Sequence, residues 1–133
     1  MTSIQRIRPA GLVVSPAFSH VAVVPPGATT IYVGGQNAVD ESGVLVGADD
    51  VAAQATRALE NALTALRAVG AGVDDVVQWT VLFVDGVDLS AAYGAIATAL
   101  VSEEPPLVTA ARVAGLGVPG ALVEISAVAA VER

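Results

Sequence analysis

Cysteine and lysine are absent from the chain, and each absence excludes a class of chemistry. Without cysteine there is no thiol nucleophile, no thiolate metal ligand and no disulfide framework. Without lysine there is no Schiff-base residue and no phosphate-binding-loop lysine, and no dinucleotide-binding glycine pattern is found. We therefore expect no cofactor. The single histidine, His20, cannot form a two-histidine site within one chain, so we also expect no metal.

Basic residues are scarce as well. All six are arginines, they are scattered along the chain, and the net charge is −7. Nucleic acids are bound by clustered basic side chains that neutralise phosphates, so no nucleic acid partner is expected. Residues 9–39 carry no formal charge, but prolines and glycines interrupt them, so no membrane span is expected. Residues 1–8 lack the apolar segment of a signal peptide, which favours a cytoplasmic location.

Aromatic residues make up only 4% of a chain that is 54% apolar. The core must therefore be built from valine, alanine and leucine. At 133 residues the chain has the size of one domain, and we expect residues 1–133 to form it. So high an apolar fraction also suggests that some apolar surface is buried in an oligomer.

Residue periodicity predicts six strands and two helices. Residues 4–7, 18–24 and 30–33 read as strands, the last ending at Gly34-Gly35, and the second and third are expected to pair as an antiparallel hairpin. Residues 49–69 have helical spacing, with acidic residues at the start and Gly70 as a stop. A second helix is expected at residues 88–100, and further strands at 75–84, 108–113 and 122–131. The paired aspartates 49–50 and 74–75 fit capping better than metal binding.

The predicted order is β-β-β-α-β-α-β-β, an α+β fold with a mixed sheet and two helices on one face. The strands containing Val76-Val77 and residues 125–131 are apolar at successive positions, so both of their faces look buried. Packing of this sheet against the sheets of other subunits is the simplest explanation.

Several short motifs occur in an order that resembles the Rid family (YjgF, reactive-intermediate deaminase). The resemblance covers nearly the whole chain and implies a chorismate-mutase-like fold, a homotrimer, and three ligand clefts between neighbouring subunits. The matching pieces are Ser15-Pro16-Ala17-Phe18-Ser19-His20, Ile31-Tyr32-Val33-Gly34-Gly35-Gln36, Gln54 with Asn61, Leu66 and Gly70, Asp74-Asp75-Val76-Val77, Pro105-Pro106-Leu107-Val108-Thr109, and Val123-Glu124-Ile125.

Deaminating members of that family hydrolyse enamines or imines derived from amino acids. The resemblance implies that Glu124 is a catalytic residue that positions the attacking water. The arginine that clamps the substrate carboxylate is replaced by Val108, and the expected tyrosine by Phe18. The resemblance and the residues together predict these ligand-binding candidates: Phe18, His20, Gly34, Gly35, Gln36 and Val108.

Each of these residues also has a structural interpretation. Glu124 could be an acceptor tied to backbone amides or to Arg112, and His20 could hydrogen-bond at a strand end. Arg112 could replace the missing clamp, or it could form a surface ion pair.

At the level of the molecule, two functions remain open. One is hydrolysis of an imine, enamine or related electrophile in the clefts of a homotrimer, and the other is metabolite binding without catalysis. Ribonuclease activity fits poorly with the acidic charge and the single histidine.

Overall fold

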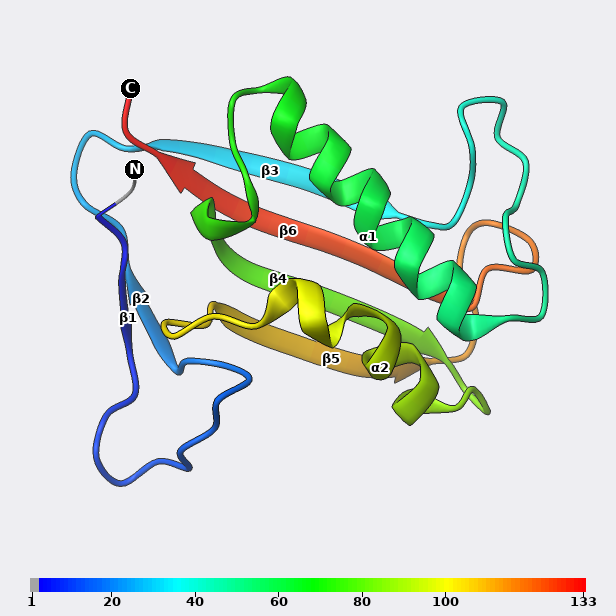
Figure 1. Ribbon diagram of the computed structural model, residues 1–133, viewed down its shortest axis with the longest axis horizontal. Coiled ribbons are helices and arrows are strands. Elements are labelled where there is room, and N and C mark those ends of the chain that lie inside the picture. The colour runs from blue at the N-terminus through cyan, green and yellow to red at the C-terminus, as the bar shows by residue number, and fades with distance from the viewer. Residues whose placement is uncertain (1–2) are drawn as a thin grey trace.

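The computed structural model describes residues 3–133 and confirms the predicted element order (Figure 1). The fold is α+β, with two helices and a mixed sheet. A short 3-10 turn, η1 (Val73–Asp75), precedes the fourth strand. The other elements are β1 (Gln5–Ile7), β2 (Val21–Val23), β3 (Thr29–Gln36), α1 (Val51–Ala68), β4 (Val76–Val84), α2 (Leu89–Leu100), β5 (Leu107–Val113) and β6 (Val123–Val131).

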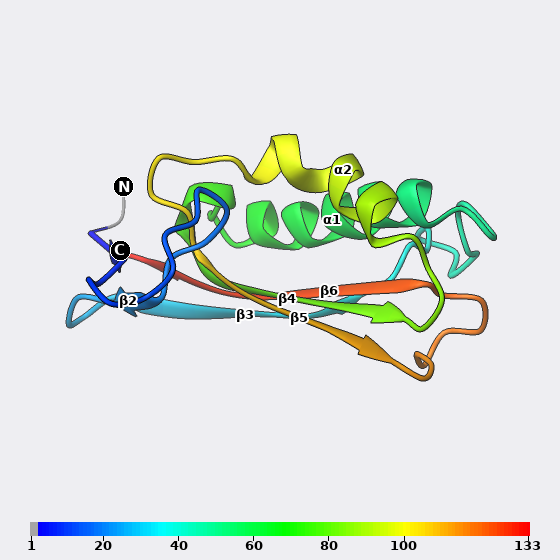
Figure 2. The ribbon, with the colours of Figure 1, turned by 90° about the horizontal axis from the view of Figure 1, so that it is seen from below.

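The main sheet has the strand order β3-β6-β4-β5. Strands β4 and β5 run parallel, because α2 carries the chain back between them, and the other two pairs are antiparallel. Both helices lie on one face of this sheet, as expected (Figure 2). We call the opposite face the open face. Among residues 3–133, no helix combines the length and the apolar character needed to cross a membrane.

The predicted hairpin between the second and third strands is wrong. Strand β2 pairs with β1 in a separate two-stranded ribbon beside one end of the main sheet, whereas β3 pairs with β6 (Figure 1). Pro25 and Pro26, in the connection between β2 and β3, have no amide hydrogen to donate to a ladder. Gly27 then adopts a φ of 84°. The connection redirects the chain to another partner instead of forming a hairpin turn.

Local capping sets the start of both helices and the end of α1, and for α1 it agrees with the prediction. The Asp50 carboxylate accepts a hydrogen bond from the Ala53 amide at the start of α1, and Asp88 does the same for Ala91 at α2. Gly70 adopts a φ of 77° just after α1, a conformation that costs glycine little. One face of α1 is buried against the sheet through Ala55, Ala58, Leu59, Ala62 and Leu66.

The open face is only partly covered within one chain. Alternate residues of β6, such as Val123 and Ile125, are buried under the helices. Ser126 and Val128 point to the open face and are half-buried, and Tyr32 on the neighbouring strand is 79% exposed. The expected burial of both sheet faces is therefore not reached by a single copy of the chain.

Candidate functional site

Glu124 lies on the open face and packs directly over Gly35. In the ladder Glu124 is opposite Leu82, on the face away from the helices. A Cβ placed on Gly35 would lie 2.6 Å from both Cδ and Oε2 of the Glu124 carboxylate. Only glycine therefore leaves room for the carboxylate in this position. At Gly34 an added Cβ would meet nothing within 4 Å.

The two glycines form a β-bulge and do not end the strand, which corrects the predicted end of this strand. The pairing of β3 with β6 shifts between Val33 and Gln36, so the extra backbone is accommodated at Gly34 and Gly35. The Gln36 side chain donates a hydrogen bond to the Gly34 carbonyl at 3.1 Å. The bulge thus brings Gly35 against Glu124 on the open face, whereas Gln36 pairs with Ile125, which is buried under the helices.

Buried amides hold the strand end that carries Glu124. The side-chain amide of Gln54, which is fully buried, accepts from the Leu122 amide at 2.8 Å and donates to the carbonyls of Gly47 and Gly120. Asn37 donates to the Val123 carbonyl at 3.1 Å. Asn61 in turn donates to the carbonyls of Asn37 and Val39. Gln54 and Asn61, two of the resemblance residues, therefore support the backbone around Glu124.

Val108 lies on the other face of the sheet, under α2. It borders an apolar cavity of about 460 Å³. We call this the apolar cavity. No arginine borders it. The residues that line it are Pro16, Ala17, Phe18, Trp79, Val81, Tyr93, Ile96, Ala97, Leu100, Val101, Ser102 and Val108.

The segment carrying Phe18 and His20 is fastened beside this cavity. The Ser19 amide donates to the Pro106 carbonyl, and the His20 amide donates to the Ile7 carbonyl. The His20 ring lies 2.7 Å, through Nε2, from the Val13 carbonyl oxygen and edge-on to the Phe18 ring. Phe18 lines the cavity, whereas His20 does not.

Tyr93 is a cavity residue that the sequence reasoning missed. It lies on α2, packs against Phe83 with ring centroids 5.3 Å apart, and lines the apolar cavity. Burial raises the pKa of its hydroxyl above the usual value of 10.0, so the hydroxyl remains a donor at neutral pH. In the sequence Tyr93 occurs at helical spacing with Ile96 and Leu100, a pattern that indicates core packing as readily as a ligand site.

The candidate residues thus form two groups on opposite faces of the sheet. Val108 pairs with Trp79, whose ring is buried under the helices, whereas Glu124 pairs with Leu82 on the open face. Arg112 pairs with Phe83 and so shares the face of Val108. Arg112 therefore cannot serve as the partner of Glu124 within one chain. Exposed at the far end of β5, it does not line the apolar cavity either.

The described part of the chain offers no close metal ligand set. Within residues 3–133, no three side chains of histidine, cysteine, aspartate or glutamate come together in a way that could hold a metal ion. The chemical groups at the candidate site are the Glu124 carboxylate on the open face, and aromatic rings with the hydroxyl groups of Tyr93 and Ser102 around the apolar cavity.

The sequence model of the endoribonuclease L-PSP family matches residues 11–131. The YjgF gene product of E. coli is 31% identical, with 83% of this chain and 85% of that chain covered and a TM-score of 0.68. The chain belongs to the Rid family. The Rid family protein YyfB from Yersinia pestis superposes with a TM-score of 0.85 over 96% of this chain and 98% of that one, at 28% identity. No curated protein matches the sequence.

A further Rid-fold structure contains a small molecule. E. coli TdcF with bound serine is 25% identical, covers 88% of this chain and 94% of that chain, and has a TM-score of 0.69.

Proposed function

We propose that this Rid family protein is a homotrimer that binds a small, uncharged and largely apolar metabolite in clefts between copies. There it hydrolyses a C=N bond with water positioned by Glu124. The observation that carries the proposal is the placement of Val108 in an apolar cavity without arginine, on the opposite side of the sheet from Glu124.

The division between the two faces supports a cleft made by two copies. One chain cannot bring its own Glu124 to its own apolar cavity, because the sheet lies between them. Apolar residues on the open face, such as Val128, are only half-buried and are available for contact with another copy. Packing sheet against sheet would cover them and could carry Glu124 of one copy to the cavity of the next.

The cavity lining supports an uncharged ligand. Transfer of a carboxylate into apolar surroundings without a partner is costly, and an arginine fork is the side chain best suited to pair with it. With valine at that position, an imino acid loses this pairing. Tyr93 and Ser102 offer hydroxyl groups to a neutral carbonyl or imine instead.

Glu124 supports hydrolysis because its carboxylate can orient and deprotonate water. In the proposed step, the water oxygen forms a bond to the imine carbon and its proton passes through Glu124 to the nitrogen. As the remaining hydroxyl proton then passes through Glu124 to the same nitrogen, the C–N bond breaks, leaving a carbonyl product and ammonia. RNA cleavage, suggested by the name of the matching sequence model, is disfavoured by the net charge of −7.

An imine-hydrolysis assay tests the proposal. Imines would be generated in situ from amines that carry no carboxylate and from amino acids. Both kinds would be supplied to the wild type, Glu124→Gln and Val108→Arg. We expect the wild type to prefer neutral imines, Glu124→Gln to lose turnover, and Val108→Arg to gain activity on imino acids, because the cavity has room for an arginine.

Three results would contradict this proposal. Equal wild-type turnover of imino acids would show that the missing arginine does not set the ligand class. Saturable binding of a neutral imine with no turnover would favour the alternative function, a metabolite-binding trimer without catalysis. RNA cleavage that survives thorough purification would contradict both the hydrolytic function and the metabolite-binding function.

A further inference from the structure

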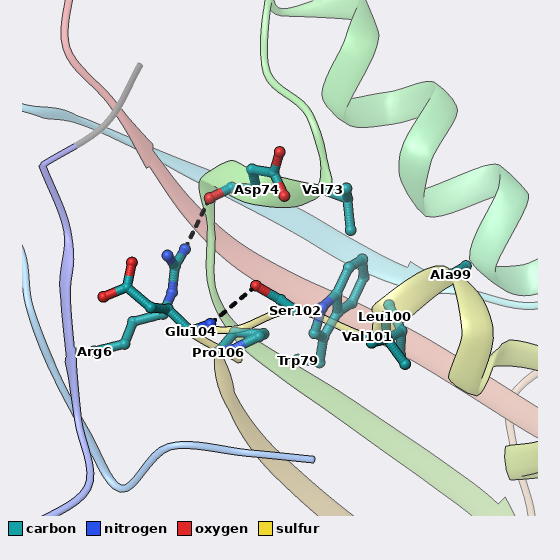
Figure 3. A pocket seen from close by; sticks show the side chains of 10 residues that line it. All are labelled: Arg6, Val73, Asp74, Trp79, Ala99, Leu100, Val101, Ser102, Glu104 and Pro106. Carbon is teal, nitrogen blue, oxygen red and sulfur yellow. Dashed lines mark hydrogen bonds between the residues drawn. The ribbon is translucent and has the colours of Figure 1, made fainter. Parts of the chain in front are cut away.

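Two buried hydrogen-bond donors border the same small pocket at the start of β4 and β5. They are Nε of Arg6, from β1, and Nε1 of Trp79, from β4, and neither has a protein partner among residues 3–133. Figure 3 shows Arg6 on one side of this pocket and the Trp79 indole on the other, with the Ser102 side chain between them. Trp79 is only 1% exposed.

Unpaired buried donors are costly, and proteins rarely leave them without a partner. One terminal nitrogen of the Arg6 guanidinium, Nη2, already has partners, because it donates to the carbonyls of Asp74 and Val76 at 2.8 and 2.7 Å. The Ser102 hydroxyl oxygen accepts from the Glu104 amide at 3.2 Å, which leaves its hydrogen free to donate. The pocket therefore presents several polar atoms to one small space.

The volume of the pocket matches a small occupant. It measures about 30 Å³, and a site needs roughly 10–15 Å³ to hold one water molecule. A small anion would fit by size, but Asp74 and Glu104 also border the pocket and would repel it. Water can accept hydrogen bonds from two donors and donate to neighbouring oxygens, so it satisfies the whole set.

We propose that one or two buried water molecules link Arg6 Nε to Trp79 Nε1, and that Arg6 thereby positions the wall of the apolar cavity. Trp79 borders both the small pocket and the apolar cavity. A fixed indole presents a fixed surface to the ligand. Arg6 itself does not line the apolar cavity. The second half of this inference rests on the proposed ligand binding in that cavity, whereas the water site does not.

Nuclear magnetic resonance tests the water site directly. Trp79 is the only tryptophan, so the indole Nε1 proton gives a single assignable signal. We expect a nuclear Overhauser effect between this proton and long-lived water, and its loss in Arg6→Met. The absence of the effect in the wild type would overturn the proposal. A shift of the indole signal with chloride but not gluconate, at equal ionic strength, would show an anion instead and would also overturn it.

Calorimetry with p-cresol, a neutral aromatic probe, tests the positioning role. We expect Arg6→Met and Trp79→Phe each to weaken p-cresol binding about fivefold to tenfold, the size of one net hydrogen bond. The double variant should lose no more than either single one. Arg8→Met is the matched control, because Arg8 also reaches a backbone carbonyl, that of Glu103, but borders neither space.

The two proposals fail in different ways. If wild-type protein shows the water signal but no p-cresol binding, the proposed ligand cavity fails and the water site stands. If p-cresol binds equally to wild type and Arg6→Met, with both folded by circular dichroism, the positioning role fails and the cavity stands.

Discussion

At the residue scale, the contact between Gly35 and Glu124 is the most constraining feature of the open face. The carboxylate occupies the space that any larger residue at position 35 would need. A Cβ added at position 34 would contact no other atom within 4 Å, although the two glycines are adjacent in the same bulge. The two positions therefore make a matched pair, in which the same small change has opposite consequences for Glu124.

We predict that Gly35→Ala displaces the Glu124 carboxylate and that Gly34→Ala does not. Turnover of neutral imines should fall to the level of Glu124→Gln in the first variant and stay near wild type in the second. Neither glycine has a positive φ, so backbone strain does not distinguish them. Equal activity of both alanine variants would show that the position of the carboxylate is not critical.

The sequence identified Gly35 and Glu124 as candidate site residues but did not predict that they lie in contact. Gly35 could equally have ended a strand or allowed a ligand to approach, because the pairing register of β3 with β6 is not encoded locally. The register, with its bulge, is what brings residues 35 and 124 together across 89 positions of sequence. Tyr93 was missed for a related reason, since one helix face serves both the core and the cavity.

At the element scale, helix ends were predictable because the chemistry that sets them is local. Asp50, Asp88 and Gly70 act within one turn of their own helices. The partner of β2 was not predictable in this way, because strand pairing depends on where a connection sends the chain. The same contrast holds within α1. Its caps act on neighbouring residues, whereas the side-chain amides of Gln54 and Asn61 have hydrogen-bond partners far away in the sequence.

We predict that Asp50→Ala lowers the free energy of unfolding by about 1 kcal/mol, through loss of the hydrogen bond to the Ala53 amide. Asp49→Gly is the control. Asp49 has a φ of 61°, which glycine adopts without penalty, so stability should be unchanged or slightly higher. Urea unfolding measures both. A larger loss in Asp49→Gly than in Asp50→Ala would refute the assignment of the cap.

We predict that Gln54→Met lowers the free energy of unfolding more than Asp50→Ala does. Methionine keeps most of the side-chain volume but makes none of the three hydrogen bonds of the Gln54 amide. The carbonyls of Gly47 and Gly120 and the amide of Leu122 would lose their partner, at a cost of roughly 2–4 kcal/mol. Thr56→Ala, at an exposed position of the same helix, should change stability little. Urea unfolding of the two variants side by side gives the comparison.

At the scale of the whole molecule, the open face is where copies would meet in the proposed trimer. Its half-buried apolar residues lie opposite the two helices, so contact through this face leaves the helices outside. The composition of the chain suggested such an interface, because an apolar fraction of 54% is high for a small domain. Which residues would form the proposed interface could be inferred only once the two sheet faces were distinguished.

We predict that Val128→Asp converts a trimer into monomers, because it places a carboxylate where sheets would pack. Light scattering after gel filtration should give three times the 13.2 kDa chain mass for wild type and one chain mass for the variant. Thr56→Asp, on the exposed side of α1, should remain trimeric. A wild-type protein that elutes as a monomer would remove the basis for clefts between copies.

The separation of Glu124 and Val108 by the sheet has a genetic consequence. If each cleft takes its carboxylate from one copy and its apolar cavity from another, a chain damaged on one face can still serve with a chain damaged on the other. Trimers reassembled from Glu124→Gln and a variant blocked at the cavity would then contain some clefts in which both halves are intact. Two inactive alleles would restore activity when expressed together, whereas two alleles damaged on the same face would not.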